Sequence, residues 1–153
     1  MLRTKIRMRL CAALLTVNLI FIWGNSLLPG DLSSALSQWV KDMLSYILPV
    51  GPSSSGSGIF LLRKLAHLTE FACLGLCLGW LFGMLYRRKL HCIGLPILCG
   101  FAAACVDETI QIFSPERGPG LRDVGIDTLG VALGIAALSL GQYIIKHNRR
   151  INK

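Results

Sequence analysis

Charged residues are scarce in this sequence, and the uncharged stretches between them are long. Only 16% of the 153 residues are Asp, Glu, Lys or Arg, whereas 53% are hydrophobic. None of these four residue types occurs from Leu10 to Leu28 or from Leu90 to Val106. Soluble domains carry more charge, and apolar runs of this length are typical of transmembrane helices. The composition therefore excludes an ordinary soluble domain.

Motifs for metal, phosphate and disulfide chemistry are also missing. The six cysteines lie within or at the rim of apolar stretches, without a CxxC pair or a Cys/His cluster at metal-binding spacing. No phosphate-binding loop or nucleophile motif stands out. We therefore expect no disulfide framework, no metal and no cofactor, and these absences favour a protein that is not an enzyme.

Basic residues outnumber acidic ones, and the net charge of +8 raises the question of nucleic acid binding. The basic segments RTKIRMR, YRRKLH and KHNRRINK each adjoin the end of an apolar stretch. Lys and Arg at such positions set the direction of membrane insertion. We therefore expect membrane lipids as partners and no nucleic acid.

Four apolar stretches are long enough to cross a bilayer core of about 30 Å at a helical rise of about 1.5 Å per residue. The predicted spans are residues 10–28, 64–85, 92–113 and 124–145. The first resembles a signal peptide, but no small-x-small cleavage site follows it cleanly, so we interpret it as an uncleaved span. The sequence predicts one domain over residues 1–153, an all-α membrane protein with a four-transmembrane-helix bundle, multi-pass in the cell membrane.

The distribution of Lys and Arg predicts the direction of these spans. An arrangement with both termini inside (N-in, C-in) leaves few basic residues outside, namely Lys41, Arg63, Lys64, Arg117 and Arg122. The cytoplasmic side then holds Arg3, Lys5, Arg7, Arg9, Arg87, Arg88, Lys89, Lys146, Arg149, Arg150 and Lys153. This asymmetry favours N-in, C-in.

The outer segment between the first two spans has a helical pattern of its own. Apolar residues recur at helical spacing over residues 31–48, with Asp31 as a predicted N-cap and Pro49 as a stop. An amphipathic helix on the outer surface and a loop packed over the bundle are both compatible with this pattern. The segment GPSSSGSG, residues 51–58, predicts a flexible tether.

Glycines recur every fourth residue in two of the spans. Gly75, Gly79 and Gly83 form one such row, and Gly130 and Gly134 form another. Small residues at this spacing let helix backbones approach closely in lipid, so these rows predict packing faces.

Ionisable residues gather at one level of the predicted bundle. The second span runs inward from RKLAHLTEF, the third runs outward to DETIQIF, and the fourth begins after RD. Glu70 and Asp107 each lie about 9 Å below the outer end of their span, at about 1.5 Å per residue. The predicted ligand-binding or polar cluster consists of Arg63, Lys64, His67, Glu70, Asp107, Glu108, Gln111, Arg117, Asp123 and Asp127.

These residues must face one another or a pocket, because an unpaired charge at that depth is costly. At about 100° per residue, Arg63, His67 and Glu70 fall within an arc of roughly 60°. His67 is expected to pair with Glu70 or Asp107, and Arg63, Lys64 and Arg117 to cap carboxylates. A ligand-facing cleft and a purely structural polar network are both compatible with the pattern.

The same segments carry a family resemblance. RKLAHLTEF, DETIQIFSPER and RDVGIDTLGVALG, with IFIWGNSLLPGDLSSALS near the first span, make the chain similar to the VanZ-like family of bacterial membrane proteins. The resemblance covers most of the chain. It implies a role in the cell envelope, because the founding member is an accessory protein that lowers susceptibility to teicoplanin-type lipoglycopeptides. It implies no catalytic mechanism.

We therefore expect a membrane protein whose outward-facing polar cluster binds a lipoglycopeptide or a lipid-linked cell-wall precursor. The alternative is a membrane enzyme acting on an extracytoplasmic lipid or glycan, with His67, Glu70 and Asp107 as its acid/base groups. A transporter is disfavoured, because no inverted repeat is visible and the polar residues occupy the outer layer only.

Overall fold

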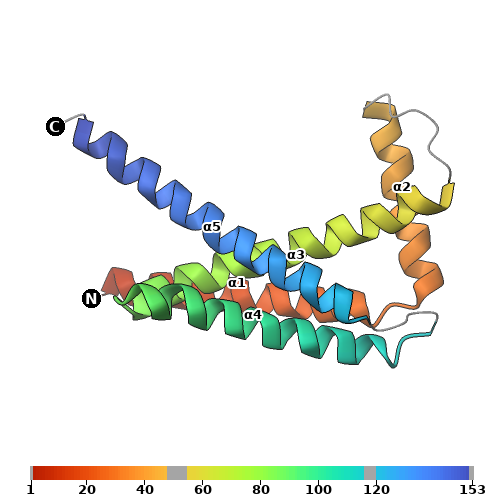
Figure 1. Ribbon diagram of the computed structural model, residues 1–153, viewed down its shortest axis with the longest axis horizontal. Coiled ribbons are helices and arrows are strands. Elements are labelled where there is room, and N and C mark those ends of the chain that lie inside the picture. The colour runs from red at the N-terminus through yellow and green to blue at the C-terminus, as the bar shows by residue number, and fades with distance from the viewer. Residues whose placement is uncertain (1, 48–54, 116–119, 152–153) are drawn as a thin grey trace.

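Five helices make up the described part of the chain, which covers residues 2–47, 55–115 and 120–151 of the computed structural model. They are α1 (Leu2–Ser26), α2 (Gly30–Ile47), α3 (Ser55–Leu85), α4 (Lys89–Gln111) and α5 (Leu121–Ile151). These residues contain no strand, so the all-α prediction is confirmed. The start of α1 and the end of α5 lie at the same end of the bundle (Figure 1), as an even number of crossings requires.

Four of the helices are long and apolar enough to cross a membrane, which confirms the four predicted spans. The spans are Thr4–Ser26, Phe60–Leu85, Lys89–Gln111 and Leu121–Ile151. The side of the membrane that each end faces stays a prediction.

The predicted tether over residues 51–58 needs a correction. Helix α3 begins at Ser55, so residues 55–58 are helical, and residues 51–54 lie outside the described residues. Serine and glycine have low helix propensity and on their own favour a flexible chain. Here they adjoin a long apolar helix, and adding residues to an existing helix is easier than starting a new one.

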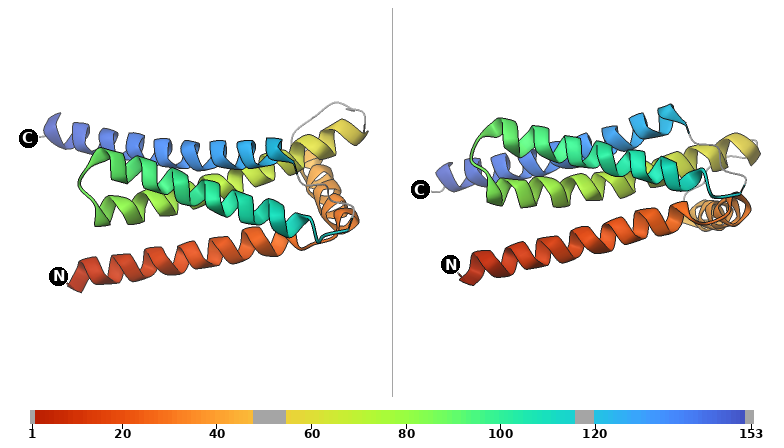
Figure 2. Two further views of the ribbon diagram at one scale, coloured as in Figure 1. Left: turned by 60° about the horizontal axis from the view of Figure 1, so that its bottom comes forward. Right: turned by 90° about the horizontal axis from the view of Figure 1, so that it is seen from below.

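α1 and α4 run roughly parallel, α3 and α5 cross each other over them, and α2 runs across one end of the bundle (Figures 1 and 2). α3 packs most extensively on α5 and also contacts α1 and α4. The end that carries α2 also holds the end of α1, the end of α4 and the start of α5, and we call it the α2 end. The opposite end holds the start of α1, the end of α5 and the short connection from α3 to α4.

Glycines make the crossing of α3 and α5 possible. A Cβ atom added to Gly130 would lie 2.6 Å from the carbonyl oxygen of Leu68. Gly134 faces the carbonyl oxygen of Ala72 even more closely. Gly83, in contrast, has open space where its Cβ would be. The predicted glycine rows therefore mark a packing face near the middle of the crossing but not along the whole row.

The core is small, and much of the apolar surface faces outward. Its buried members are Ile22, Phe71, Leu74, Leu78, Ala104, Val131 and Ile135. Large apolar side chains elsewhere on the spans, such as Leu14, Phe101 and Leu133, are exposed. An apolar surface of this extent suits contact with lipid tails rather than with water.

The predicted outer helix exists as α2. It starts at Gly30, one residue before Asp31, so the predicted N-cap role of Asp31 is wrong. Asp31 lies in the first turn instead, where its Oδ1 accepts a 2.7 Å hydrogen bond from the backbone N–H of Leu32. The apolar side chains of Leu36 and Trp39 are exposed, which suits a helix that lies at a membrane surface.

Gly134→Ala is expected to destabilise the protein, because the added methyl group meets the α3 backbone at Ala72. Overpacking of this kind costs about 1–3 kcal/mol. Thermal unfolding in detergent measures the effect as a lower midpoint. Gly83→Ala is the matched control, and it should leave the midpoint unchanged or raise it, since alanine favours the helix. Equal midpoints for the two variants would contradict a tight crossing at Gly134.

Candidate functional site

Among the residues that the structure describes, six polar ones are buried at the α2 end of the bundle. Each exposes no more than 6% of its surface. They are Ser26, Asp107, Glu108, Gln111, Ser114 and Asp127. Because buried polar groups cost free energy unless they are paired, their partners show what holds this end together and what is left for a ligand.

One part of the cluster joins the end of α1 to the end of α4. Gln111 Nε2 donates hydrogen bonds to Asp107 Oδ2 at 2.8 Å and to Ser26 Oγ at 3.3 Å. Ser114 Oγ donates to the backbone carbonyl of Ser26 at 2.6 Å. Asp107 and Gln111 are four residues apart, so they lie on one face of α4. These contacts give Gln111 and Ser114 a structural role.

A second part holds the start of α5 in place. Lys64 of α3 forms an ion pair with Asp123 of α5. The backbone N–H of Gly120 donates a 2.8 Å hydrogen bond to Glu108 Oε2 on α4. The predicted capping of a carboxylate by Lys64 is confirmed by this ion pair.

The third part brings together one side chain from each of three helices. His67 Nδ1 of α3 lies 3.9 Å from Asp127 Oδ1 of α5. A carboxylate oxygen of Asp107 on α4 completes the group, and the three donor atoms all lie within 4.8 Å of one another. Asp107 Oδ1 and Asp127 Oδ2 are buried and have no hydrogen-bond partner among the described residues. We call His67, Asp107 and Asp127 the His–Asp–Asp group.

The space beside this group is small. A cavity of about 10 Å³ is lined by Arg63, Lys64, His67, Glu108, Gln111, Asp123, Ile126 and Asp127. A volume of about 10–15 Å³ holds one water molecule. A roomy cleft between α3, α4 and α5 was one of the two predicted arrangements, and a cavity of this size does not admit an antibiotic or a lipid headgroup.

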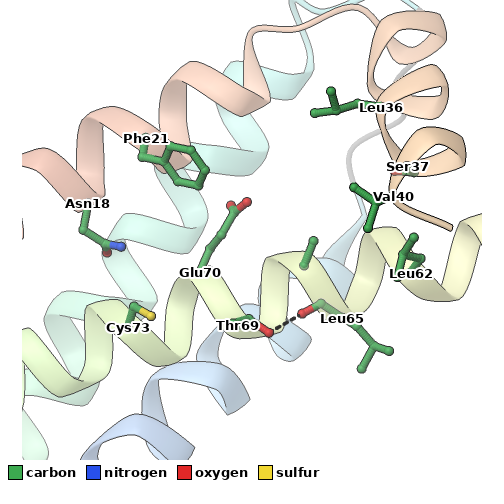
Figure 3. Close-up of a pocket in the computed structure, with 11 residues that line it drawn as sticks. Asn18, Phe21, Leu36, Ser37, Val40, Leu62, Leu65, Thr69, Glu70 and Cys73 are labelled. Atoms are coloured by element: carbon green, nitrogen blue, oxygen red, sulfur yellow. Dashed lines mark hydrogen bonds between the residues drawn. The ribbon is translucent and has the colours of Figure 1, made fainter. Parts of the chain in front are cut away.

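Glu70 lies apart from that cavity and lines a groove between α1, α2 and α3 (Figure 3). Its Oε1 accepts a 3.0 Å hydrogen bond from Asn25 Nδ2 of α1. The groove has a volume of about 520 Å³, and its other lining residues are Asn18, Phe21, Leu36, Ser37, Val40, Leu62, Leu65, Ala66, Thr69 and Cys73. Arg63, His67 and Glu70 were predicted to share one face of α3, but they line two different sites. Arg63 and His67 lie at the small cavity, and Glu70 lies in the groove.

Eight of the ten predicted cluster residues meet at or beside the small cavity. They are Arg63, Lys64, His67, Asp107, Glu108, Gln111, Asp123 and Asp127. Glu70 belongs to the groove, and Arg117 lies outside the described residues. His67 was predicted to pair with Glu70 or Asp107. In the structure its Nδ1 lies 3.9 Å from Asp127 Oδ1, and a donor atom of Asp107 lies within 4.8 Å. The role of the ten predicted cluster residues in ligand binding stays a prediction.

Three polar residues of this end were not predicted as site residues. Asn25, Ser26 and Ser114 supply the contacts to Glu70, Gln111 and the end of α4. A signal was present, because Asn25 and Ser26 are polar residues at the end of an apolar span. Polar residues at such a position also occur simply where a helix leaves the membrane, so the sequence did not single them out.

An all-helical fold with four long apolar spans and an apolar outer surface defines a multi-pass membrane protein. A family model described as VanZ/LLP1 matches residues 10–142. The chain therefore belongs to the VanZ/LLP1 family, and the resemblance seen in its polar motifs is confirmed. The match covers the whole polar cluster and the groove. Neither the curated proteins nor the solved structures gave a match.

Removing one partner of the ion pair, as in Lys64→Gln or Asp123→Asn, is expected to lower stability by about 1.5–3 kcal/mol, the typical value of a hydrogen bond to a charged group. The double variant should lose less than the sum of the two single losses, because it leaves no unpaired charge. Thermal unfolding of the four proteins measures this coupling. Arg122→Ala, at the exposed neighbouring position, is the control and should have little effect. Additive losses would show that the pair does not interact.

Proposed function

We propose that this VanZ-family protein binds an amphiphilic ligand of the cell envelope in the groove between α1, α2 and α3. The observation that carries the proposal is the single carboxyl group of Glu70 in an otherwise largely apolar groove of about 520 Å³. Pockets for small ligands usually measure about 300–1,000 Å³ and are mostly apolar with a few polar groups. The size and the lining of this groove therefore suit a ligand.

The apolar part of the groove suits an acyl or prenyl chain. Phe21 of α1, Leu36 and Val40 of α2, and Leu62 and Leu65 of α3 surround the opening (Figure 3). Phe21, Leu36 and Leu65 expose about half of their surface, so the groove is open along its side rather than enclosed. A hydrocarbon chain can enter such a groove from the surrounding lipid without crossing water.

The polar part of the groove suits a ligand that donates hydrogen bonds. Glu70 offers a carboxylate, and Asn18 Oδ1 has no hydrogen-bond partner among the described residues. Thr69 already donates its hydroxyl to the carbonyl of Leu65. Acceptors therefore dominate this part, and they favour hydroxyl or ammonium groups over phosphate.

A lipoglycopeptide or a lipid-linked wall precursor combines a hydrocarbon chain with sugar hydroxyls. The VanZ relationship favours these ligands, since the family's founding member acts on susceptibility to teicoplanin-type antibiotics. The predicted N-in, C-in orientation supports the same conclusion, because it places the α2 end on the outer side. Retention of an acylated antibiotic in the groove would lower susceptibility to it.

An enzyme is the second candidate. One observation favours it, and the cavity of only about 10 Å³ beside His67 and Asp127 counts against it. His67 Nδ1 lies 3.9 Å from Asp127 Oδ1 and close to Asp107, which is an arrangement used for general acid/base catalysis. Turnover of a lipid-linked substrate that disappears in His67→Ala would support this function. Binding of the same ligand without turnover favours the first candidate.

Glu70→Gln is expected to weaken binding of a teicoplanin-type lipoglycopeptide by roughly 10- to 100-fold, because a hydrogen bond to a charged acceptor is lost. The glutamine oxygen still accepts from Asn25, so the fold should be kept. Equilibrium binding of the acylated antibiotic to purified protein measures the change. The deacylated antibiotic is the ligand control and should bind weakly to both proteins. Equal affinity of the wild type and the variant for the acylated antibiotic would show that Glu70 does not contact the ligand.

Ala66→Trp should block the groove, because Ala66 lines it. Ala102→Trp is the matched control, since Ala102 on α4 is also exposed and does not line the groove. Binding of the acylated antibiotic should be lost in the first variant and kept in the second. Equal binding by both variants would show that the ligand lies elsewhere.

The orientation can be tested with single cysteines at the two ends of the third span, one near the start of α4 and one just after its end, in a chain whose own cysteines are replaced. Phe113 and Leu90 are similarly exposed, at 80% and 79%. A membrane-impermeant maleimide added to intact cells should label Phe113→Cys, whereas Leu90→Cys should react only after permeabilisation. The reverse pattern would place the groove on the cytoplasmic side.

A further inference from the structure

We infer that His67, Asp107 and Asp127 bind a divalent transition-metal ion at the α2 end of the bundle. The site is separate from the groove, because Glu70 lines the groove and the His–Asp–Asp group lies with α4 and α5. The inference goes beyond ligand binding in the groove and does not depend on it. It also departs from the expectation of no metal, which was drawn from the sequence.

The donor atoms suit such an ion in type and in position. One imidazole nitrogen and two carboxylate oxygens are typical ligands of Zn²⁺ and Mn²⁺. Bonds of about 2.0–2.2 Å require donor atoms about 3–3.6 Å apart. The three donor atoms here lie within 4.8 Å of one another, so small side-chain rotations close the remaining distance.

The carboxylates are incomplete without an additional partner. Asp107 and Asp127 expose 0% and 1% of their surface, and Asp107 Oδ1 and Asp127 Oδ2 have no hydrogen-bond partner among the described residues. A buried oxygen of this kind costs free energy, because it has left water without a replacement. A metal ion between the two carboxylates supplies the missing partner for both.

The surroundings of the group match an ion in charge and in size. Lys64 and Asp123 neutralise each other, which leaves the carboxylates of Asp107, Asp127 and Glu108 and the guanidinium of Arg63 beside the cavity. Three negative groups and one positive group sum to two negative charges, which a divalent cation balances. The adjoining cavity of about 10 Å³ leaves room for one water molecule as a further ligand.

The supporting contacts hold the donors in place. Gln111 Nε2 donates to Asp107 Oδ2 at 2.8 Å, so the other oxygen of Asp107 stays available to an ion. Gly130 follows Asp127 by one helical turn and packs against the carbonyl of Leu68, the residue after His67. The close α3–α5 crossing thereby fixes the distance between His67 and Asp127. Contacts of this kind orient the ligands in metal sites.

Metal content of the full-length protein tests the inference. The protein is purified in detergent with an affinity tag that lacks histidine, stripped with a chelator and then equilibrated with Zn²⁺ or with Mn²⁺. After removal of unbound ion, elemental analysis should find about one ion per chain in the wild type. His67→Gln, Asp107→Asn and Asp127→Asn should each reduce the affinity by at least about tenfold, since each loses one of three protein ligands.

Matched controls distinguish this site from metal binding elsewhere on the chain. His91→Ala and His147→Ala remove the other two histidines of the chain and should keep the full metal content. Glu70→Gln should also keep it, although it weakens binding in the groove, so the two proposals can fail separately. Because a substitution at a buried position can unfold the chain, each variant's thermal midpoint is measured without metal. A wild type without bound ion, or His–Asp–Asp variants that are folded and bind as well as the wild type, would overturn the inference.

Discussion

Every charged group inside this bundle needs a partner, because hydrocarbon provides none, and this constraint organises the α2 end. Lys64 meets Asp123, and Glu108 accepts from the backbone of Gly120. These contacts connect α3, α4 and α5 where the helices would otherwise have only weak apolar packing to hold them, since lipid tails solvate apolar side chains equally well. The polar groups that remain after this pairing are the ones available for chemistry.

Most of the fold was predictable from hydropathy and helical spacing. Long, mostly apolar runs identified the four spans, because a helix must be predominantly apolar over about 20 residues to cross a bilayer. The same periodicity found α2, although Asp31 does not cap it. The sequence could not show that α3 begins at Ser55, because the helical state of those serines and glycines depends on the long helix that follows them.

The candidate site was predictable as a layer but not as individual contacts. Depth along the spans predicted that Glu70, Asp107 and Asp127 lie near one level, and the structure brings Asp107 and Asp127 together with His67. These residues come from three helices and are far apart in the sequence, so no short motif reveals that their donor atoms meet. The sequence also could not show that Glu70 faces the groove, because this depends on its contact with Asn25 and on the way α1 packs against α3.

The ion pair between Lys64 and Asp123 joins residues that are 59 positions apart. During synthesis the ammonium group of α3 therefore enters the membrane before its counter-ion exists. A lysine within hydrocarbon costs up to about 2.5–3.5 kcal/mol, less near the end of a helix. The first three spans therefore carry an uncompensated charge until α5 supplies Asp123 and completes the assembly.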